Sequence, residues 1–546
     1  MKHRNILSAL LIVPLAALGQ GVEVPVSEDL EPMMTGRYEA TWESLSQYET
    51  PEWFRDAKFG IWAHWGPQCV EGSGDWMARS MYIEDSREYK HHLEHYGHPS
   101  EVGFKDILPL FKAEKWNPDS LVALYKKAGA RYFFALGNHH DNFDLWDSKY
   151  QEWNSMAIGP KRDILGEWAE ACRRNDIPFG ISLHADHAWM WYEPARRYDR
   201  KGDKAGIPYD GRLTKADGKG KWWEGLDPQN LYAQNHPESF GSWCDGMTGR
   251  QWGWGGGVAI PTPEYCTNFY NRTLDVINRY NPDLLYFDVT GVPFYPISDA
   301  GLKIAAHFYN HNEATHPGAF SAVMFGKILT DTQKEALVWD VERGAPNNIP
   351  DKPWQTCTCI GGWHYNTEFY EKGWYKSAAQ VVKMLADVVS KNGNLLLSIP
   401  LRADGTFDEK EEVVINGIGE WLATNGEAIY STRPWKIFGE GPVAEADIAL
   451  NDQGFNEGAY TAATAAEIRF TQTPRNLYAI ALRWPEDNRI TVKALAKGSA
   501  YHKGAIRSVE LLGYGKVPFT RTADALCVTL PADAPKSVAP VIRIRK

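Results

Sequence analysis

Two carboxylic acids and a set of histidines follow short apolar runs of the sequence, where side chains are positioned to do chemistry. Asp288 ends the run LLYFDV, and Glu342 ends the run ALVWDVE. Two carboxyl groups on either side of a glycosidic bond can hydrolyse it, because one acid protonates the leaving oxygen while the other carboxylate faces the sugar. The pair therefore predicts sugar-bond hydrolysis, provided that the fold brings both acids to one rim.

Neither acid is specific when it is taken alone. An aspartate at the end of a strand often caps the next turn, and Glu342 has an adjacent salt-bridge partner in Arg343. Glu368, in the loop YNTEFY after another apolar run, is an alternative for the proton donor. The joint placement of Asp288 and Glu342 beside histidines and tryptophans favours that pair.

Histidines gather at the ends of three other apolar runs, namely His64, His139, His140, His184 and His187. Neutral imidazoles both donate and accept hydrogen bonds, which suits a ligand rich in hydroxyl groups. The segments HHD and HADH also offer ligands for zinc or manganese, but the sequence has no H-E-x-x-H motif. We therefore expect hydroxyl recognition and no metal or other cofactor, with a metal-dependent hydrolase as a further alternative.

Eight short apolar runs, each ending in polar residues, alternate with segments that have helical spacing. Such runs, buried on both faces, favour a closed parallel (β/α)8 barrel of the α/β class, in which catalytic groups lie at the carboxyl ends of the strands. The runs are FGIWAHW (59–65), RYFFALGNH (131–139), FGISLHA (179–185), LLYFDV (284–289), FSAVMFG (320–326), ALVWDVE (336–342), QTCTCIG (355–361) and NLLLSIP (394–400). Helices are expected around SLVALYKKAG, GEWAEACRRND, EYCTNFYNRTLDVINRY and SAAQVVKMLADVVSKNG.

Three further regions have residue patterns that differ from the repeated strand and helix segments of the barrel. Residues 1–19 have a basic start and an apolar core, which predict a cleaved signal peptide and export to the periplasm or outside. Residues 186–263 show no strong period and predict a long insertion above the third strand, within a barrel domain of residues 22–440. Short alternating runs from residue 441 to residue 546 predict an appended antiparallel β-sandwich.

Composition narrows the classes of ligand and partner. The net charge of −11 argues against nucleic acid, and no apolar run after the signal peptide is long enough to span a membrane. The 23 tryptophans, including those in KWWEG and QWGWGGG, exceed what a core explains easily and suit stacking on sugars. Seven scattered cysteines do not define a disulfide framework, and Cys357 and Cys359 are expected to be buried on one strand. The pattern leaves the oligomeric state open.

Several of these segments resemble glycoside hydrolase family 29, the α-L-fucosidases. The resemblance covers nearly the whole barrel and runs through WFRDAKFGIWAHWG (53–66), GNHHDNFDLWDSKYQEWN (137–154), GPKRDILGEWAEACR (159–173), FGISLHADHAW (179–189), NPDLLYFDVTG (281–291), VSKNGNLLLSIPLRADG (389–405) and NGEAIYSTRPW (425–435). It also implies the carboxyl-terminal sandwich.

The resemblance implies roles for individual residues. Asp288 corresponds to the nucleophile, and VWDVERG resembles the segment of one subgroup that carries the acid/base, here Glu342. The other positions that we expect to bind substrate are His64, His139, His140, His184, Tyr286, Trp76 and Asp75. Tyr286 stands where the family often has Trp, and Asp75 stands where it usually has Glu.

The implied activity is that of an exo-acting retaining α-L-fucosidase that works on fucosylated oligosaccharides or glycoconjugates. The alternative is a barrel that binds fucose or a related sugar without catalysis. The linkage that is cleaved is not determined by the sequence.

Overall fold

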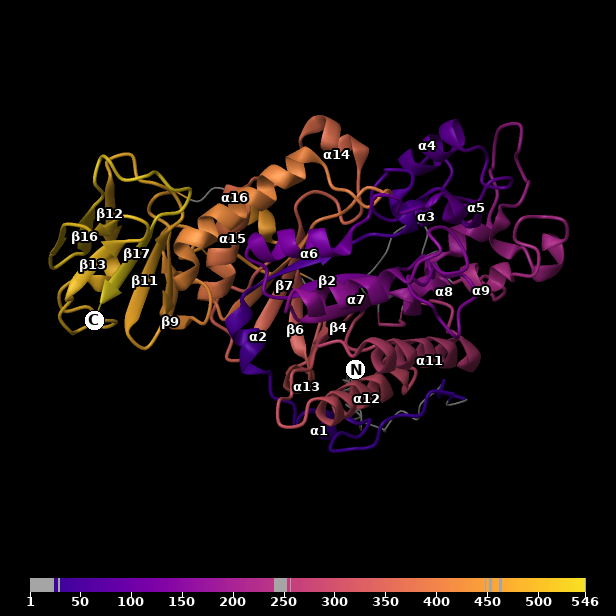
Figure 1. The fold of residues 1–546 in the computed structure, drawn as a ribbon, viewed down its shortest axis with the longest axis horizontal. Coiled ribbons are helices and arrows are strands. Elements are labelled where there is room, and N and C mark those ends of the chain that lie inside the picture. Colours follow the sequence, from indigo (N-terminus) through magenta and orange to yellow (C-terminus); the bar gives the residue numbers. More distant parts are fainter. Residues whose placement is uncertain are drawn as a thin grey trace, which may run out of the picture.

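The computed structural model describes residues 24–27, 30–239, 253–255, 257–446, 448–450, 454–460 and 464–545. The predicted signal peptide, Cys244 and Trp252 lie outside these ranges. Within them the chain forms an α/β barrel followed by antiparallel sheets, and the predicted fold class is confirmed (Figure 1).

Eight parallel strands close into a barrel in the order of the sequence. Strand β1 pairs with β2 on one side and with β8 on the other, with Ile61 opposite Phe133 and Leu397. Each apolar run of the sequence supplies one strand, because side chains on both strand faces are enclosed by the barrel interior and the outer helices. The strands are β1 (Phe59–Ala63), β2 (Phe133–Asn138), β3 (Phe179–Leu183), β4 (Leu284–Phe287), β5 (Val323–Gly326), β6 (Val338–Glu342), β7 (Trp354–Cys359) and β8 (Gly393–Ser398).

Several of the longer barrel helices begin at a polar residue whose side chain caps the helix N-terminus. Asn117, Asp163, Thr262 and Ser377 each accept a backbone hydrogen bond in the first turn of the helix that follows. The larger helices of the barrel are α4 (Arg87–His95), α6 (Pro118–Lys127), α7 (Ile164–Arg174), α11 (Pro263–Tyr280), α12 (Ala300–Thr315), α15 (Ala378–Ser390) and α16 (Glu409–Asn425). Shorter ones are α1 (Trp42–Leu45), α2 (Glu52–Ala57), α3 (Met77–Ser80), α5 (Phe104–Ile107), α13 (Gln333–Ala336) and α14 (Thr367–Lys372).

The long insertion after β3 contains only short helical pieces in its described part. They are η3 (Ala185–His187), α8 (Ala188–Trp191), η4 (Glu193–Arg196), η5 (Asp210–Arg212), η6 (Lys215–Gly218) and α9 (Pro228–Tyr232). Trp223 and Trp254, from the two tryptophan-rich motifs of the insertion, are buried core residues, whereas Trp222 is half exposed and donates to Asp106. The stacking role suggested by its tryptophan content therefore does not extend to Trp223 or Trp254.

The C-terminal region consists of a six-stranded and a three-stranded antiparallel sheet. The first has the order β14-β13-β17-β11-β10-β9, and the second has the order β12-β16-β15. The strands are β9 (Arg433–Glu440), β10 (Ile468–Gln472), β11 (Asn476–Ala481), β12 (Arg489–Val492), β13 (Ser508–Leu511), β14 (Gly515–Lys516), β15 (Phe519–Arg521), β16 (Leu526–Thr529) and β17 (Val541–Arg545). Since β9 pairs with β10, this region begins at Arg433 rather than at residue 441.

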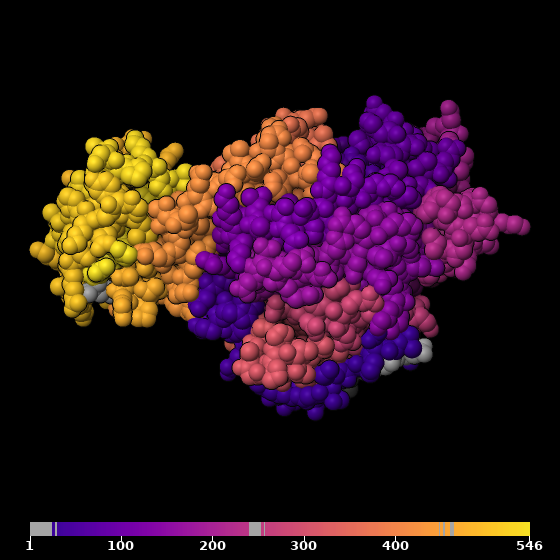
Figure 2. Space-filling model, in the orientation of Figure 1, coloured from indigo at the N-terminus to yellow at the C-terminus, as the bar shows by residue number. Residues whose placement is uncertain are grey.

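The larger sheet packs directly on the barrel helices. In Figure 1 the yellow strands lie beside the orange helices α15 and α16, and Figure 2 shows the yellow lobe joined to the body across that orange surface. Tyr478, Ile480 and Val541 belong to the same apolar cluster as the barrel core. Trp421 of α16 donates its indole N–H to the carbonyl of Ala539 at 2.9 Å. Among the described residues, no helix is long and apolar enough to cross a bilayer.

Candidate active site

The two acids singled out by the sequence meet at one end of the barrel. Asp288 follows β4, Glu342 is the last residue of β6, and Lys327 follows β5, the strand between them. Lys327 Nζ lies 2.5 Å from Asp288 Oδ1 and 2.6 Å from Glu342 Oε2. The two carboxylate oxygens that share this ammonium group are therefore at most 5.1 Å apart.

A small pocket of about 160 Å³ opens over these three side chains. Except for Phe455 of the C-terminal region, its other lining residues come from the ends of several strands and from the loops after them, as expected of a parallel barrel. They are Trp62, His64, Asp75, Trp76, His139, His184, Tyr286, Cys357, Trp363 and Phe455. The pocket thus combines carboxylates, imidazoles and aromatic rings, the equipment to hold hydroxyl groups and the apolar faces of a ring.

The surroundings of the pocket lower the pKa of Asp288 and raise that of Glu342. Burial would raise the pKa of Asp288, but the charge of Lys327, together with His140 and His184, outweighs burial and holds that pKa well below its usual range. Burial raises the pKa of Glu342, and the charge of Asp288 adds to that rise, while Lys327 opposes it. Two carboxyl groups with separated pKa values are suited to opposite roles, one ionised and one able to hold a proton.

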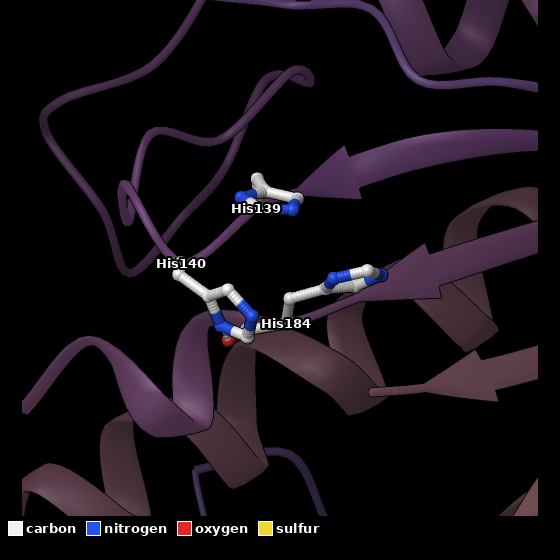
Figure 3. A group of neighbouring side chains, drawn as sticks. All are labelled: His139, His140 and His184. Atoms are coloured by element: carbon white, nitrogen blue, oxygen red, sulfur yellow. Dashed lines mark hydrogen bonds between the residues drawn. The ribbon is translucent and has the colours of Figure 1, made fainter. Parts of the chain in front are cut away.

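Three histidines face the pocket as neutral rings. Burial holds the pKa values of His64, His139 and His184 well below the ordinary value. Figure 3 shows His139 and His184 where β2 and β3 end, with His140 beside them. The protein fixes one nitrogen of each pocket ring, through Ser398 at 2.8 Å for His64, Gln68 at 2.8 Å for His139, and Ser182 for His184.

The other ring nitrogens are left for a ligand. Because Gln68 Nε2 donates to His139 Nδ1, the neutral ring of His139 carries its proton on Nε2. His184 Nδ1 is buried, has no hydrogen-bond partner within the described part of the chain, and lies 3.9 Å from Asp288 Oδ2. These nitrogens form a fixed set of donors and acceptors for hydroxyl groups.

His140 and His187 lie outside the pocket lining. His140 Nδ1 donates to the carbonyl of His184 at 2.7 Å, and its Nε2 lies 3.3 Å from Asp288 Oδ2. His140 is thus a partner of the Asp288 carboxylate, and its role in binding substrate stays a prediction. The buried His187 ring stacks on Trp254 instead, with 5.1 Å between the ring centres.

Asp75, Trp76 and Tyr286 all line the pocket. Asp75 Oδ1 accepts a hydrogen bond from His364 Nδ1 at 2.8 Å and lies 3.9 Å from His139 Nε2. Trp76 has a left-handed backbone, with φ of 61°, at the start of α3. Tyr286 turns its hydroxyl toward the buried Asp340, 3.1 Å away, and leaves its ring to the pocket.

In the part of the chain that the structure describes, two side-chain groups have the spacing of metal ligands. They are His139 with His140 and His184, and Asp75 with His139 and His364, and in each group the ligand atoms lie within 4.8 Å of one another. Both ring nitrogens of His140 already have protein partners, and Nδ1 of His139 accepts from Gln68. The first group would have to give up the contact between His140 and Asp288 to bind a metal.

The structure does not bring Glu368 into the site. This residue lies on α14, where it pairs with Arg87 at 2.7 Å and with Lys372. These hydrogen bonds, that from Lys372 first, lower its pKa, which is the opposite of what a proton donor needs. Glu368 as an alternative acid was wrong, because the loop after β7 turns it away from the pocket.

Five residues that line the pocket were not among the predicted site residues, namely Trp62, Lys327, Cys357, Trp363 and Phe455. Lys327 directly follows a predicted strand, so a search for every ionisable residue at strand ends, not only acids and histidines, would have found it. His364, which donates to the predicted residue Asp75, was also missed, because the two residues lie in loops that follow different strands. Phe455 comes from the C-terminal region, and no local pattern connects it to the barrel.

Comparisons with known proteins agree with this architecture. A family model described as Alpha-L-fucosidase matches residues 27–427, and a model described as Alpha-L-fucosidase C-terminal domain matches residues 462–545. The chain is 27% identical over 461 residues to an α-L-fucosidase of Branchiostoma floridae, covering 84% of each chain. It is 26% identical over 498 residues to the human plasma α-L-fucosidase, covering 88% of this chain and 85% of the relative.

A solved structure extends the likeness to the whole fold. The Thermotoga maritima α-fucosidase in complex with fucose is 26% identical, with a TM-score of 0.64. The match covers 93% of this chain and 100% of the Thermotoga chain.

Proposed function

This chain belongs to the α-L-fucosidase family of glycoside hydrolases, and on that premise we propose that it hydrolyses terminal α-L-fucosyl linkages of oligosaccharides or glycoconjugates by a retaining, double-displacement mechanism. The observation that carries the proposal is the bridged pair of acids, Asp288 and Glu342, which share Lys327 at the floor of one small pocket.

The spacing of the two acids supports retention of configuration. Retaining glycosidases hold their carboxyl groups about 5 to 5.5 Å apart, whereas inverting enzymes need about 6.5 to 9.5 Å to admit a water molecule. The limit of 5.1 Å between the bridged oxygens supports the retaining arrangement.

The size and chemistry of the pocket support action on a terminal sugar. Its volume of about 160 Å³ is smaller than the roughly 300 to 1,000 Å³ typical of sites for drug-sized ligands, so it suits one sugar ring. Neutral His64, His139 and His184 suit hydroxyl groups rather than an anionic ligand. The fucose complex of the Thermotoga relative agrees with this ligand class.

In the first step an oxygen of the ionised Asp288 attacks the anomeric carbon. The bond from that carbon to the leaving oxygen breaks, and Glu342 gives its proton to that oxygen, so a glycosyl ester forms on Asp288. In the second step the Glu342 carboxylate takes a proton from water, whose oxygen attacks the same carbon and releases Asp288. Lys327 offsets the negative charge that alternates between the two carboxyl groups.

The decisive test is release of fucose from 4-nitrophenyl α-L-fucoside and from fucosylated oligosaccharides. The Asp288→Asn variant should lose activity by about a thousandfold or more, because an amide cannot form the ester. Glu368→Gln is the matched control and should retain wild-type activity, since Glu368 lies outside the pocket. Proton NMR should show the α-anomer of fucose as the first product.

Three results would contradict the proposal. Binding of fucose without release would leave a sugar-binding barrel, the β-anomer as first product would exclude retention, and loss of activity on treatment with EDTA would point to a metal-dependent hydrolase. Substantial hydrolysis by the Asp288→Asn variant would reject that residue as the nucleophile.

Export of the protein forms part of the same proposal. It rests on the basic and apolar pattern of residues 1–19 in the sequence. Amino-terminal sequencing of the protein purified from its natural source should begin near Gln20, and a mature chain that begins at Met1 would contradict it.

A further inference from the structure

A short segment of the C-terminal region, residues 454–457, reaches the rim of the catalytic pocket. It lies in the connection between β9, an edge strand of the larger sheet, and its neighbour β10. Gly454 forms a parallel bridge with Glu342, and the Phe455 amide donates to the Glu342 carbonyl at 2.8 Å. A segment of the C-terminal region thus contacts the backbone of Glu342, the proposed acid/base.

The rest of the segment is fastened to the same rim. Asn456 accepts a hydrogen bond from the Ala345 amide at 2.9 Å and donates to the Ala345 carbonyl at 3.0 Å. The Glu457 amide donates to the Arg343 carbonyl at 2.9 Å. The Glu457 carboxylate accepts from Thr358 at 2.6 Å and pairs with Lys376 at 2.7 Å. These contacts fix the segment against β6 and β7.

The backbone of the segment is specialised for this close approach. Gly454 has φ of +126°, and a Cβ atom there would lie 2.1 Å from the Glu342 carbonyl oxygen. The next residue, Phe455, has φ of +53°, a left-handed conformation that is a marked outlier for a bulky residue. Unfavourable conformations of this kind persist where the surroundings enforce them, and they cluster at functional sites. The molecule holds a large aromatic ring where glycine or asparagine would fit with less strain.

Phe455 forms part of the pocket wall, next to the Glu342 backbone. It lines the pocket together with both acids, yet 48% of Phe455 remains exposed to solvent. Trp62 and Tyr286, in contrast, are buried among the pocket residues. Phe455 therefore presents an apolar face at the mouth, where a ligand projects out of the pocket.

Chemistry decides which part of the substrate lies there. A general acid gives its proton to the oxygen of the leaving group, so whatever that oxygen is attached to must lie next to the acid. We propose that Phe455 is the platform for the leaving group, stacking against the ring bonded through the scissile oxygen and favouring ring-shaped leaving groups. This inference rests on the proposed function.

The test compares substrates that differ only in the leaving group. The probes are α-L-fucosyl fluoride, whose leaving group is a single atom, 4-nitrophenyl α-L-fucoside, and a fucosylated disaccharide. Their kcat/KM values include only the steps up to departure of the leaving group. Phe455→Ala should lower kcat/KM about two- to twelvefold for the two ring-bearing substrates, the size expected for loss of an aromatic contact, and leave the fluoride unchanged.

Matched variants separate stacking from other causes. Phe455→Trp should retain the wild-type preference, and Phe455→Leu should lose most of it, because leucine keeps apolar bulk without a flat face. Tyr514→Ala removes another exposed aromatic ring, far along the C-terminal region, and should behave as wild type. Inhibition by free fucose should be the same in all of these proteins, since fucose does not reach the platform.

Different failures have different meanings. Unchanged kinetics of Phe455→Ala on all three substrates overturn the inference and leave the proposed function standing. An equal loss on all three, with weaker inhibition by fucose or a shifted pH profile, also overturns it, because the segment would then act by holding Glu342. If the wild-type protein releases fucose from none of the substrates, the proposed function fails and this inference fails with it.

Discussion

At the scale of single residues, Lys327 accounts for much of the electrostatics of the pocket. One ammonium group contacts both acids, yet the pKa of Asp288 is lowered and that of Glu342 is raised. The difference arises because burial acts on both acids, but Asp288 also has His140 and His184 near it, whereas Glu342 has the charge of Asp288 against it. The resulting gap keeps the proposed nucleophile ionised at a pH where the acid holds its proton.

Replacing Lys327 by methionine should move the pH profile to higher pH. A cation favours the charged form of a carboxyl group, so its removal raises the pKa of both Asp288 and Glu342. Both limbs of the plot of log kcat/KM against pH should then shift upward, with a fall of about tenfold or more at the wild-type optimum. Lys327→Arg keeps the charge and should keep the position of both limbs. A Lys327→Met profile with unmoved limbs would contradict this account.

The sequence allowed part of this site to be predicted. The sequence located Asp288, Glu342, His64, His139 and His184 because each stands at or just after the end of a recognisable strand, and strand ends share one rim in a parallel barrel. The position of Phe455 at the pocket could not be predicted in this way, since it depends on how the C-terminal region packs against the barrel. The alternative acid Glu368 failed because sequence order gives the loop but not the direction of its side chains.

At the scale of elements, continuous apolar runs made the barrel strands predictable and irregular patterns hid the rest. All eight strands fall inside the predicted runs or within one residue of them, because burial on both faces favours apolar side chains along most of each strand. Helix α12 lacked a clear apolar stripe, since its buried residues include His307, Asn310 and Asn312, which hydrogen-bond to other parts of the chain. The insertion after β3 has no strong period to detect, and its described part consists of turns and short helices.

The contact between strand β10 and helix α15 contains a buried ionic cluster. Arg469 Nε lies 2.5 Å from Asp387 Oδ1, and its Nη1 lies 3.1 Å from Glu467 Oε2. Lys391 also pairs with Asp387, at 2.7 Å. Arg469 and both acids are almost fully buried, so water cannot replace a missing partner.

Arg469→Met should therefore destabilise the protein strongly. Removing one partner of a buried ion pair leaves the other charge without compensation, which costs about 3 to 5 kcal/mol of the free energy of unfolding. Urea unfolding followed by tryptophan fluorescence would measure the change. Arg174→Met, which removes an exposed pair with Asp119, is the control and should have little effect. Equal stability of the two variants would show that the cluster does not hold the two elements together.

At the scale of the whole molecule, the barrel and the C-terminal sheet share one core. Residues of β11 and β17 pack into the barrel's apolar cluster, and Trp421 hydrogen-bonds across the boundary. The sequence placed the change of texture near residue 441, but strand β9 already belongs to the sheet. Alternation along β9 was hard to recognise because most of its residues are only partly buried.

A chain that ends at residue 432 should not behave as an independent enzyme. It would expose the apolar surface that the sheet now covers on α15 and α16, and large exposed apolar patches lead to aggregation. We expect low soluble yield, strong binding of a hydrophobic dye and no release of fucose, in contrast to the full-length protein. A soluble, monomeric and active fragment would contradict this expectation.

The reach of residues 454–457 to Glu342 has a consequence for biosynthesis. A ribosome builds the chain from its amino end, so all eight barrel strands emerge before residues 454–457 have been made. The wall beside the acid is therefore the last part of the catalytic centre to be assembled. A nascent or prematurely terminated polypeptide lacks that wall, and full turnover begins only once translation has run past the barrel into the second lobe.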